Sequence, residues 1–297
     1  AAWGVTMHEA KLNGLRMRWA DTATTDAERA RPVVLFMHGF PELWFSWRHQ
    51  LKAVHAAGYR GIAPDMRGYG GSDVPEHMAN YSVYSLAGDM LALLQRIGAS
   101  TAALVGHDHG AMLGWKLALL HPDVFVCYMA MSVPYSRSPI APVSGMRRFF
   151  VEGKAEPVWR RMAQQTQPPR WMSQAEVNYF VKEFERTGWD GGLNWYRVMD
   201  LDWEATPQLK GLKVKQPAAF IGGSADGVIV MSGGKKRTTK GLKNVCEQLD
   251  FVRFLDGAGH WVQQERPQEV NKDLLEFLGK HREKFSAAST GAPRSRL

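Results

Sequence analysis

The fold of this chain is decided by Ala102-Ala103-Leu104-Val105-Gly106-His107-Asp108-His109-Gly110, an apolar strand pattern that runs into a tight turn. A helical pattern, Ala111 to Leu120, follows at once. Small residues on both sides of Asp108 suit a strained strand-to-helix turn, because a side chain on either flank would not fit. The pattern predicts a nucleophile elbow that presents a carboxylate. Such a carboxylate attacks an electrophilic carbon, and the ester formed must then be hydrolysed by activated water.

Two other interpretations of Asp108 stay open at this point. Asp is also favoured as a helix N-cap, although a cap needs no glycine pair around it. His107 and His109 flank the carboxylate and suggest a metal site, but the sequence has no second His, Asp or Cys cluster at ligand spacing to complete the shell. We therefore expect no metal and no organic cofactor.

The composition indicates a globular protein. The chain has 297 residues and 45% hydrophobic residues, enough for a substantial core. The net charge is +8, but the basic residues are dispersed, so we expect no nucleic-acid partner. Their densest cluster, Lys235-Lys236-Arg237, is expected to be a solvated loop. No apolar run reaches membrane-spanning length, and Cys127 and Cys246 lack the spacing of a disulfide scaffold.

Strand and helix patterns alternate along most of the chain. An N-terminal hairpin is expected around Asn13-Gly14, the preferred pair for a two-residue turn. The expected strands are Val5 to Glu9, Leu15 to Trp19, Val33 to Met37, Gly61 to Pro64, Ala102 to Val105, Val124 to Met131, Pro217 to Ile221 and Phe251 to Phe254. The clearest helical patterns are Val83 to Ile97, Ala111 to Leu120 and Pro267 to His281. This alternation predicts an α/β fold with a mostly parallel sheet flanked by helices.

The alternation is interrupted between Met131 and Pro217 by a stretch rich in Trp and Arg with helical character. We expect a core of residues 1–133 and 216–285, an inserted helical cap of residues 134–215, and a flexible tail of residues 286–297. A cap over the carboxyl ends of parallel strands would close the crevice in which such sheets bind ligands.

Two further residues complete the predicted chemistry. His260 follows a strand and small residues, and it is the best candidate for the base that activates water. Asp226 lies beyond another strand end and would orient that base, although Asp before Gly is also ordinary turn chemistry. The acid and the base follow the nucleophile in the chain order of hydrolase triads. The backbone N–H groups of Phe40 and His109 would bind the developing oxyanion. His38 is expected to be structural, and Pro41 to be a candidate for a cis peptide.

Several stretches resemble soluble epoxide hydrolases of the α/β-hydrolase superfamily, the plant and algal type especially. They are His38-Gly39-Phe40-Pro41-Glu42, Asp65 to Asp73, Gly106 to Gly110, and Gly188 to Glu204, with Gly191-Gly192-Leu193-Asn194-Trp195-Tyr196-Arg197 the most specific. The resemblance implies an α/β-hydrolase fold and conversion of an epoxide and water to a vicinal diol. By the same resemblance, Asp108 is the nucleophile, His260 the base, Asp226 the charge-relay acid, and Tyr196 the acid that assists ring opening.

The chain departs from this family at one point. A second cap tyrosine is expected a few residues before Arg148 to Gly153, but Ser144, Gly145, Met146 and Arg147 stand there. Tyr135 or Tyr179 would have to replace it, or one tyrosine would act alone. A dehalogenase with the same triad, or a ligand-binding relic with little turnover, therefore stays an alternative.

The expected partner is a small apolar epoxide, since the cap is rich in tryptophan. Trp195, Trp44 and Tyr135 are the candidate substrate contacts. The protein is expected to be a monomer or homodimer. Ser295-Arg296-Leu297 resembles the peroxisomal Ser-Lys-Leu signal, so a peroxisomal or cytoplasmic location is expected.

Overall fold

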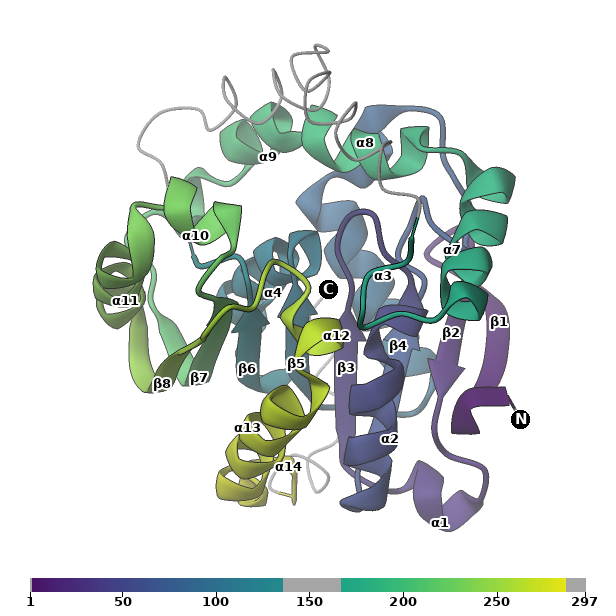
Figure 1. Ribbon diagram of the computed structural model, residues 1–297, viewed down its shortest axis with the longest axis horizontal. Coiled ribbons are helices and arrows are strands. Elements are labelled where there is room, and N and C mark those ends of the chain that lie inside the picture. The colour runs from purple at the N-terminus through teal and green to yellow at the C-terminus, as the bar shows by residue number, and fades with distance from the viewer. Residues whose placement is uncertain (1, 136–166, 287–297) are drawn as a thin grey trace.

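One sheet forms the centre of the computed structural model, which describes residues 2–135 and 167–286 (Figure 1). Its strand order in this part of the chain is β1-β2-β4-β3-β5-β6-β7-β8. The strands are β1 (Thr6–Leu12), β2 (Leu15–Asp21), β3 (Val33–Met37), β4 (Arg60–Pro64), β5 (Ala102–His107), β6 (Phe125–Met131), β7 (Val214–Gly223) and β8 (Cys246–Leu255). β1, β2 and β4 pair antiparallel, and all other neighbours are parallel.

The central strands form because they are continuous apolar runs, and β3 and β5 are buried along their whole length. β1 instead alternates between partly buried and exposed residues, as a strand at the sheet edge does. β7 and β8 are longer than predicted, because the two strands pair from Val214 opposite Cys246 to Gly223 opposite Leu255. Polar residues in β8 mask this extension in the sequence pattern.

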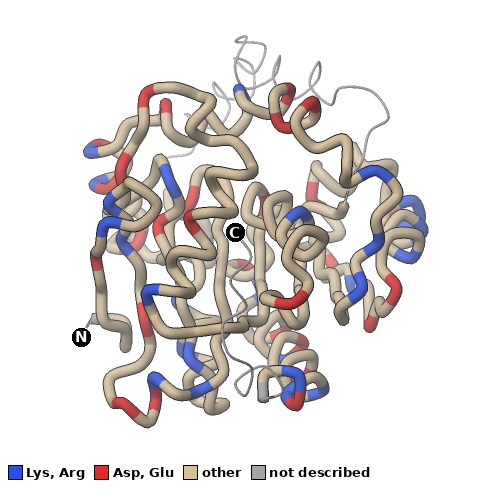
Figure 2. Tube along the Cα trace, turned by 180° about the vertical axis from the view of Figure 1, so that it is seen from behind, with Lys and Arg blue, Asp and Glu red and all other residues tan. Residues whose placement is uncertain are grey.

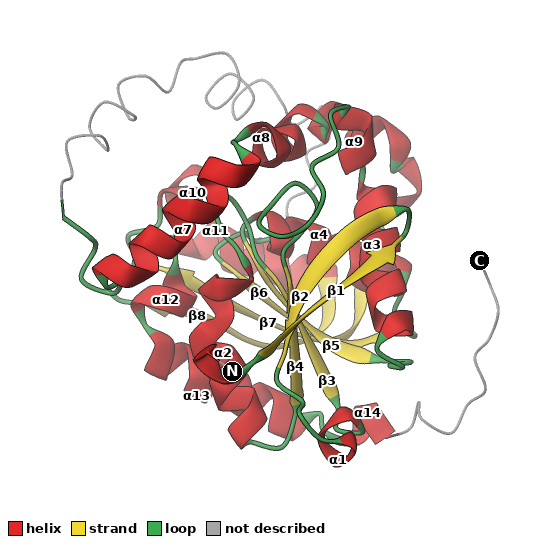
Figure 3. Cartoon of the chain, turned by 90° about the vertical axis from the view of Figure 1, so that its right-hand side faces the viewer, coloured by secondary structure: helices red, strands yellow, loops and turns green. Residues whose placement is uncertain are grey.

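Helices cover both faces of the sheet. α2 (Arg48–Ala56) and α13 (Pro267–Lys280) pack side by side on one face, and α3 (Val83–Arg96) and α4 (His109–Leu120) on the other (Figures 1 and 3). The remaining core helices are α1 (Asp26–Arg29), α10 (Gly227–Met231), α11 (Gly234–Val245), α12 (Val262–Glu265) and α14 (Glu283–Ser286), with the 3₁₀ turns η1 (Ala2–Gly4), η2 (Trp44–Trp47) and η3 (Met78–Tyr81).

The insertion between β6 and β7 is helical in its described part. It contains α7 (Gln174–Thr187), α8 (Asp190–Arg197), α9 (Met199–Ala205) and the 3₁₀ turn η4 (Pro207–Leu209). α8 and α9 cross above the carboxyl end of the sheet at the top of Figure 1, and α7 runs down its right-hand side. Residues 136–166, which the predicted cap includes, and the predicted terminal signal Ser295-Arg296-Leu297 lie outside the described residues.

Charge is distributed around the trace, with basic residues gathered along α11 at the right of Figure 2. The prediction of a loop at Lys235-Lys236-Arg237 is wrong, because these residues form the first turn of α11. α11 buries Thr238, Leu242 and Val245 at a helical spacing. The sequence pattern predicted a loop instead, because glycines come directly before the helix.

Cys127 and Cys246 are free and buried. Among the described helices, none has both the length and the apolarity to cross a bilayer.

Candidate active site

Asp108 occupies a sharp bend between β5 and α4, with φ at 52°. The neighbouring glycines make this bend possible. A Cβ on Gly106 would lie 2.5 Å from the carbonyl oxygen of Gly110, and a Cβ on Gly110 would lie 2.1 Å from that of Met37. The Asp108 side chain makes no cap hydrogen bond to α4, so the interpretation of Asp108 as a helix cap is wrong.

Three side chains from three strand ends form a chain of contacts. Nε2 of His260 lies 3.3 Å from Oδ2 of Asp108, and Nδ1 lies 3.0 Å from Oδ2 of Asp226. The other carboxylate oxygen of Asp226 accepts from the N–H of Val228 at 2.8 Å and caps α10. Asp226 thus contacts His260 through one oxygen and caps α10 through the other, and its role as the charge-relay acid stays a prediction.

The charges in this chain of contacts shift its pKa values. Burial would raise the pKa of Asp108, but the hydrogen bond and the positive charge of His260 hold it well below its usual range. Burial would lower the pKa of His260, but its hydrogen bonds to Asp108 and Asp226 raise it to about 10. The site thus holds an ionised Asp108 carboxylate beside a protonated His260 imidazole.

The turn after β3 brings the N–H of Phe40, a predicted oxyanion donor, to Asp108. The N–H of Phe40 donates to Oδ1 of Asp108 at 2.9 Å, and the Phe40–Pro41 peptide is cis. Gly39 is required here, because a Cβ on it would lie 2.3 Å from Cβ of Asp108. His38 is buried, with Nδ1 donating to the Gly39 carbonyl at 2.9 Å, as a structural residue would be. The role of the His109 N–H as second donor stays a prediction.

A buried polar layer that the sequence did not reveal lies behind the triad. Nδ1 of His107 lies 2.6 Å from Oε2 of Glu42, and Nε2 lies 2.8 Å from the carbonyl oxygen of His260. Burial would raise the pKa of Glu42, but the neighbouring His107 lowers it. His107 thus bridges the Glu42 carboxylate and the His260 carbonyl. Ser132 Oγ donates to the same His260 carbonyl at 2.6 Å.

The other contacts of Glu42 complete this layer. Its carboxylate also accepts from the Gly39 N–H at 3.1 Å and from the side-chain amides of Gln263 and Gln264, at 2.9 and 3.1 Å. The only sequence signal for the layer is a histidine at the end of a buried strand, which needs polar partners once it is buried. Among the described residues, no cluster of His, Cys, Asp and Glu could hold a metal ion.

Helix α8 brings Tyr196 and Trp195 of the cap onto the core. The Tyr196 ring packs edge-on against Phe40 at 5.5 Å and lies 4.2 Å from the His109 ring. Nε1 of Trp195 donates to the carbonyl of Arg67 at 3.0 Å. Burial, and then the negative charge of Asp108, raise the pKa of Tyr196 well above its ordinary value. The phenol therefore keeps its proton and can donate it.

Two glycines allow α8 to approach so closely. A Cβ on Gly191 would lie 2.4 Å from the carbonyl oxygen of Gly68, and a Cβ on Gly192 would lie 2.8 Å from the Phe40 ring. The cap motif that carries the family resemblance is thus the point at which cap and core touch.

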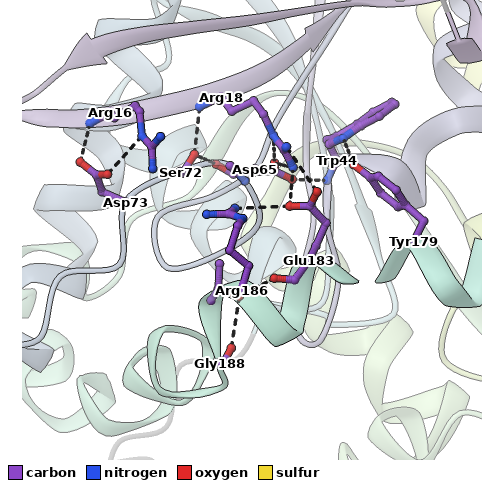
Figure 4. A network of polar contacts seen from close by, with 12 residues as sticks. Arg16, Arg18, Trp44, Asp65, Ser72, Asp73, Tyr179, Glu183, Arg186 and Gly188 are labelled. Carbon is purple, nitrogen blue, oxygen red and sulfur yellow. Dashed lines mark hydrogen bonds and ion pairs between the residues drawn. The ribbon is translucent and has the colours of Figure 1, made fainter. Parts of the chain in front are cut away.

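Two of the predicted substrate contacts have other partners. Nε1 of Trp44 donates to the hydroxyl of Tyr179 at 2.9 Å, in a network where Arg18 joins Asp65 of the core to Glu183 of α7 (Figure 4). The Tyr135 ring packs edge-on against Trp115 at 5.9 Å. The substrate role of Trp44 and Tyr135 stays a prediction, whereas Trp195 lies beside His109.

Comparisons with known proteins agree with this geometry. A family model described as alpha/beta hydrolase fold matches residues 32–267. The Epoxide hydrolase A of Mycobacterium tuberculosis is 38% identical over 90% of this chain and 95% of its own length. The Epoxide hydrolase 3 of Siraitia grosvenorii is 34% identical over 90% of this chain and 96% of its own length.

Solved structures show the same likeness. A crystal structure of an epoxide hydrolase from Vigna radiata superposes with a TM-score of 0.84 at 34% identity, covering 94% of this chain and 99% of that one. The Epoxide Hydrolase A of Mycobacterium thermoresistibile superposes with a TM-score of 0.80 at 36% identity, covering 93% of this chain and 98% of that one.

Proposed function

We propose that this chain, which belongs to the epoxide hydrolase family of the α/β-hydrolase fold, adds water to an epoxide through a covalent ester on Asp108. The observation that carries the proposal is the contact chain from Asp108 through His260 to Asp226, with the phenol of Tyr196 on the cap side. The names of the relatives support the substrate class.

Ring opening begins when a carboxylate oxygen of Asp108 attacks an epoxide carbon. A carbon–oxygen bond to Asp108 forms as the ring carbon–oxygen bond breaks, and the electron pair of the broken bond stays on the departing oxygen. Tyr196 gives its proton to that oxygen. The low pKa of Asp108 keeps the nucleophile ionised throughout the working pH range.

Formation of the ester changes the state of His260. The ester carries no charge, so the main contribution that raises the pKa of His260 disappears and only Asp226 still favours the imidazolium. His260 releases its proton to solvent and the Tyr196 phenolate takes a proton back, so the total charge of the site is unchanged. The neutral His260 then takes a proton from water, and the hydroxide adds to the ester carbonyl, whose oxyanion the N–H of Phe40 stabilises. The carbon–oxygen bond between the Asp108 carbonyl carbon and the substrate oxygen breaks, and that oxygen takes the proton of the new carboxyl group, which releases the diol and restores the carboxylate.

The substrate is a small apolar epoxide. Rings of Phe40, Trp195 and Tyr196 lie around the reacting groups, and such rings favour apolar ligands. A dehalogenase would use the same three residues, but His109 stands where that family has a halide-binding tryptophan.

A single turnover in heavy-oxygen water tests the mechanism. Enzyme in excess over styrene oxide should form unlabelled diol while the label enters Asp108, and the Asp108→Ala variant should form no diol. Label that goes directly into the diol would refute the ester. Binding of styrene oxide without any diol would favour the ligand-binding relic, and turnover of 1-chlorobutane alone would favour the dehalogenase.

For the location we propose peroxisomal import, supported by the resemblance of Ser295-Arg296-Leu297 to the Ser-Lys-Leu signal. A fluorescent protein with this tripeptide at its carboxyl end should enter peroxisomes, and the same fusion without the tripeptide should stay in the cytoplasm. Diffuse fluorescence of both fusions would contradict import.

A further inference from the structure

The imidazole of His109 is buried beside the nucleophile without a polar partner. Its residue is only 4% exposed, and neither Nδ1 nor Nε2 has a hydrogen-bond partner among the described residues. Buried polar groups in folded proteins are nearly always hydrogen-bonded, so an unpaired one in a candidate active site indicates a group that is paired only when a ligand is bound.

Neighbouring rings hold this imidazole in place. Trp195 stacks on it nearly parallel at 5.6 Å, and Tyr196 lies at 4.2 Å. The titratable groups that act on its pKa are the carboxylate of Asp108, the imidazoles of His260 and His38, and the ammonium group of Lys116. The ring therefore lies among the groups that are expected to surround the epoxide.

The His109 ring carries no charge at neutral pH. Burial lowers its pKa more strongly than the charge of Asp108 raises it. A neutral imidazole has one N–H donor and one acceptor nitrogen, and neither is used within the described protein. It can therefore donate one hydrogen bond to a substrate oxygen without giving up another.

The departing oxygen needs such a donor. Tyr196 is one, and the tyrosine expected as the second is absent from the sequence, since residues 136–166 contain no tyrosine at all. Of the two substitutes considered above, Tyr179 lies in the polar network of Trp44, Arg18 and Asp65, and the Tyr135 ring packs on Trp115.

We propose that the N–H of His109 donates a hydrogen bond to the epoxide oxygen and, with Tyr196, stabilises the alkoxide as the ring opens. Tyr196 transfers the proton and His109 keeps its own, so no further reactant is needed. The proposal rests on the epoxide hydrolase function proposed above and assigns a catalytic residue within it.

The test compares His109→Phe with His109→Gln, which keeps an N–H donor. Styrene oxide is the probe because the ring oxygen is its only polar atom, so a lost hydrogen bond must act there. Rapid-quench single turnovers measure ester formation and ester hydrolysis separately. We expect His109→Phe to slow ester formation on the order of 10²-fold and to leave ester hydrolysis within about threefold of the wild type. His109→Gln should recover most of the loss.

Melting temperatures separate this role from a structural one. Replacing an unpaired buried polar group by an apolar ring breaks no hydrogen bond, so His109→Phe should melt no lower than the wild type. Ester formation at the wild-type rate in His109→Phe, or equal slowing in both variants, would overturn the proposal. If the wild type itself forms neither ester nor diol, the proposed function fails instead.

Discussion

The free energy of unfolding of the wild type should fall as the pH rises from neutral to alkaline. Replacing Asp108 by Asn should remove most of this fall. In the folded protein, burial disfavours the imidazolium of His260, but the hydrogen bonds to Asp108 and Asp226 outweigh it and raise the pKa to about 10, from an ordinary 6.5. A histidine whose pKa is higher in the folded chain than in the unfolded chain stabilises the fold. This stabilisation is complete below the pKa of the unfolded chain and is lost as the pH rises through the pKa of the folded chain.

The size of the effect follows from the proton count. Between about pH 7 and pH 9 the folded chain keeps the His260 proton, while the unfolded chain has lost most of it. One proton changes the free energy of unfolding by about 1.4 kcal/mol per pH unit, so the wild type should lose about 2 to 3 kcal/mol across this window. The amide of the Asp108→Asn variant carries no charge, and the pKa of His260 should then fall towards its ordinary value.

Urea unfolding of both proteins across this pH range measures the effect, because residues that titrate alike in both cancel in the difference. His260→Gln is the matched control and should show the same flattened pH dependence as Asp108→Asn. Parallel stability curves for the wild type and Asp108→Asn would refute the coupling of Asp108 to His260.

Three further predictions concern single positions. Gly39→Ala should lower kcat/KM at least about tenfold, because the new Cβ would lie 2.3 Å from that of Asp108. The control Gly279→Ala has open space around its new Cβ and should keep full activity. Equal activities of the two variants would contradict the clash. Asp226→Asn keeps an oxygen to cap α10 but loses the charge that orients His260, so ester hydrolysis should slow on the order of 10²- to 10⁴-fold and intact-protein mass spectrometry should detect the accumulated ester; unchanged turnover without ester would count against the relay. Glu42→Gln replaces a carboxylate that accepts on both oxygens by an amide that accepts on one, so it should lower the free energy of unfolding in urea by about 1 to 3 kcal/mol, and a variant as stable as the wild type would contradict these hydrogen bonds.

The sequence was sufficient to predict the elements that carry the site. β3 has the predicted bounds, and the patterns before Asp108 and Asp226 are strands that end at one edge of a parallel sheet. Parallel strands bring their carboxyl ends together, so the position of these residues in the chain was enough to place them near one another.

The polar layer behind the triad could not be predicted in this way. Glu42 and His107 are 65 residues apart, and His107 and the His260 carbonyl are 153 apart, so no local period relates them. The partner of Trp44 was missed for the same reason. A buried aromatic position is visible in the sequence, but the helix it meets, α7, is fixed only by the packing of the whole cap.

The contact of α8 with the core through Gly191 and Gly192 has a consequence for protein engineering. Side chains at these two positions would collide with Gly68 and Phe40, so a mutant library that varies them should yield mostly misassembled lids. Neighbouring positions that carry side chains are better starting points for widening the range of accepted molecules, because these side chains can be replaced by smaller ones.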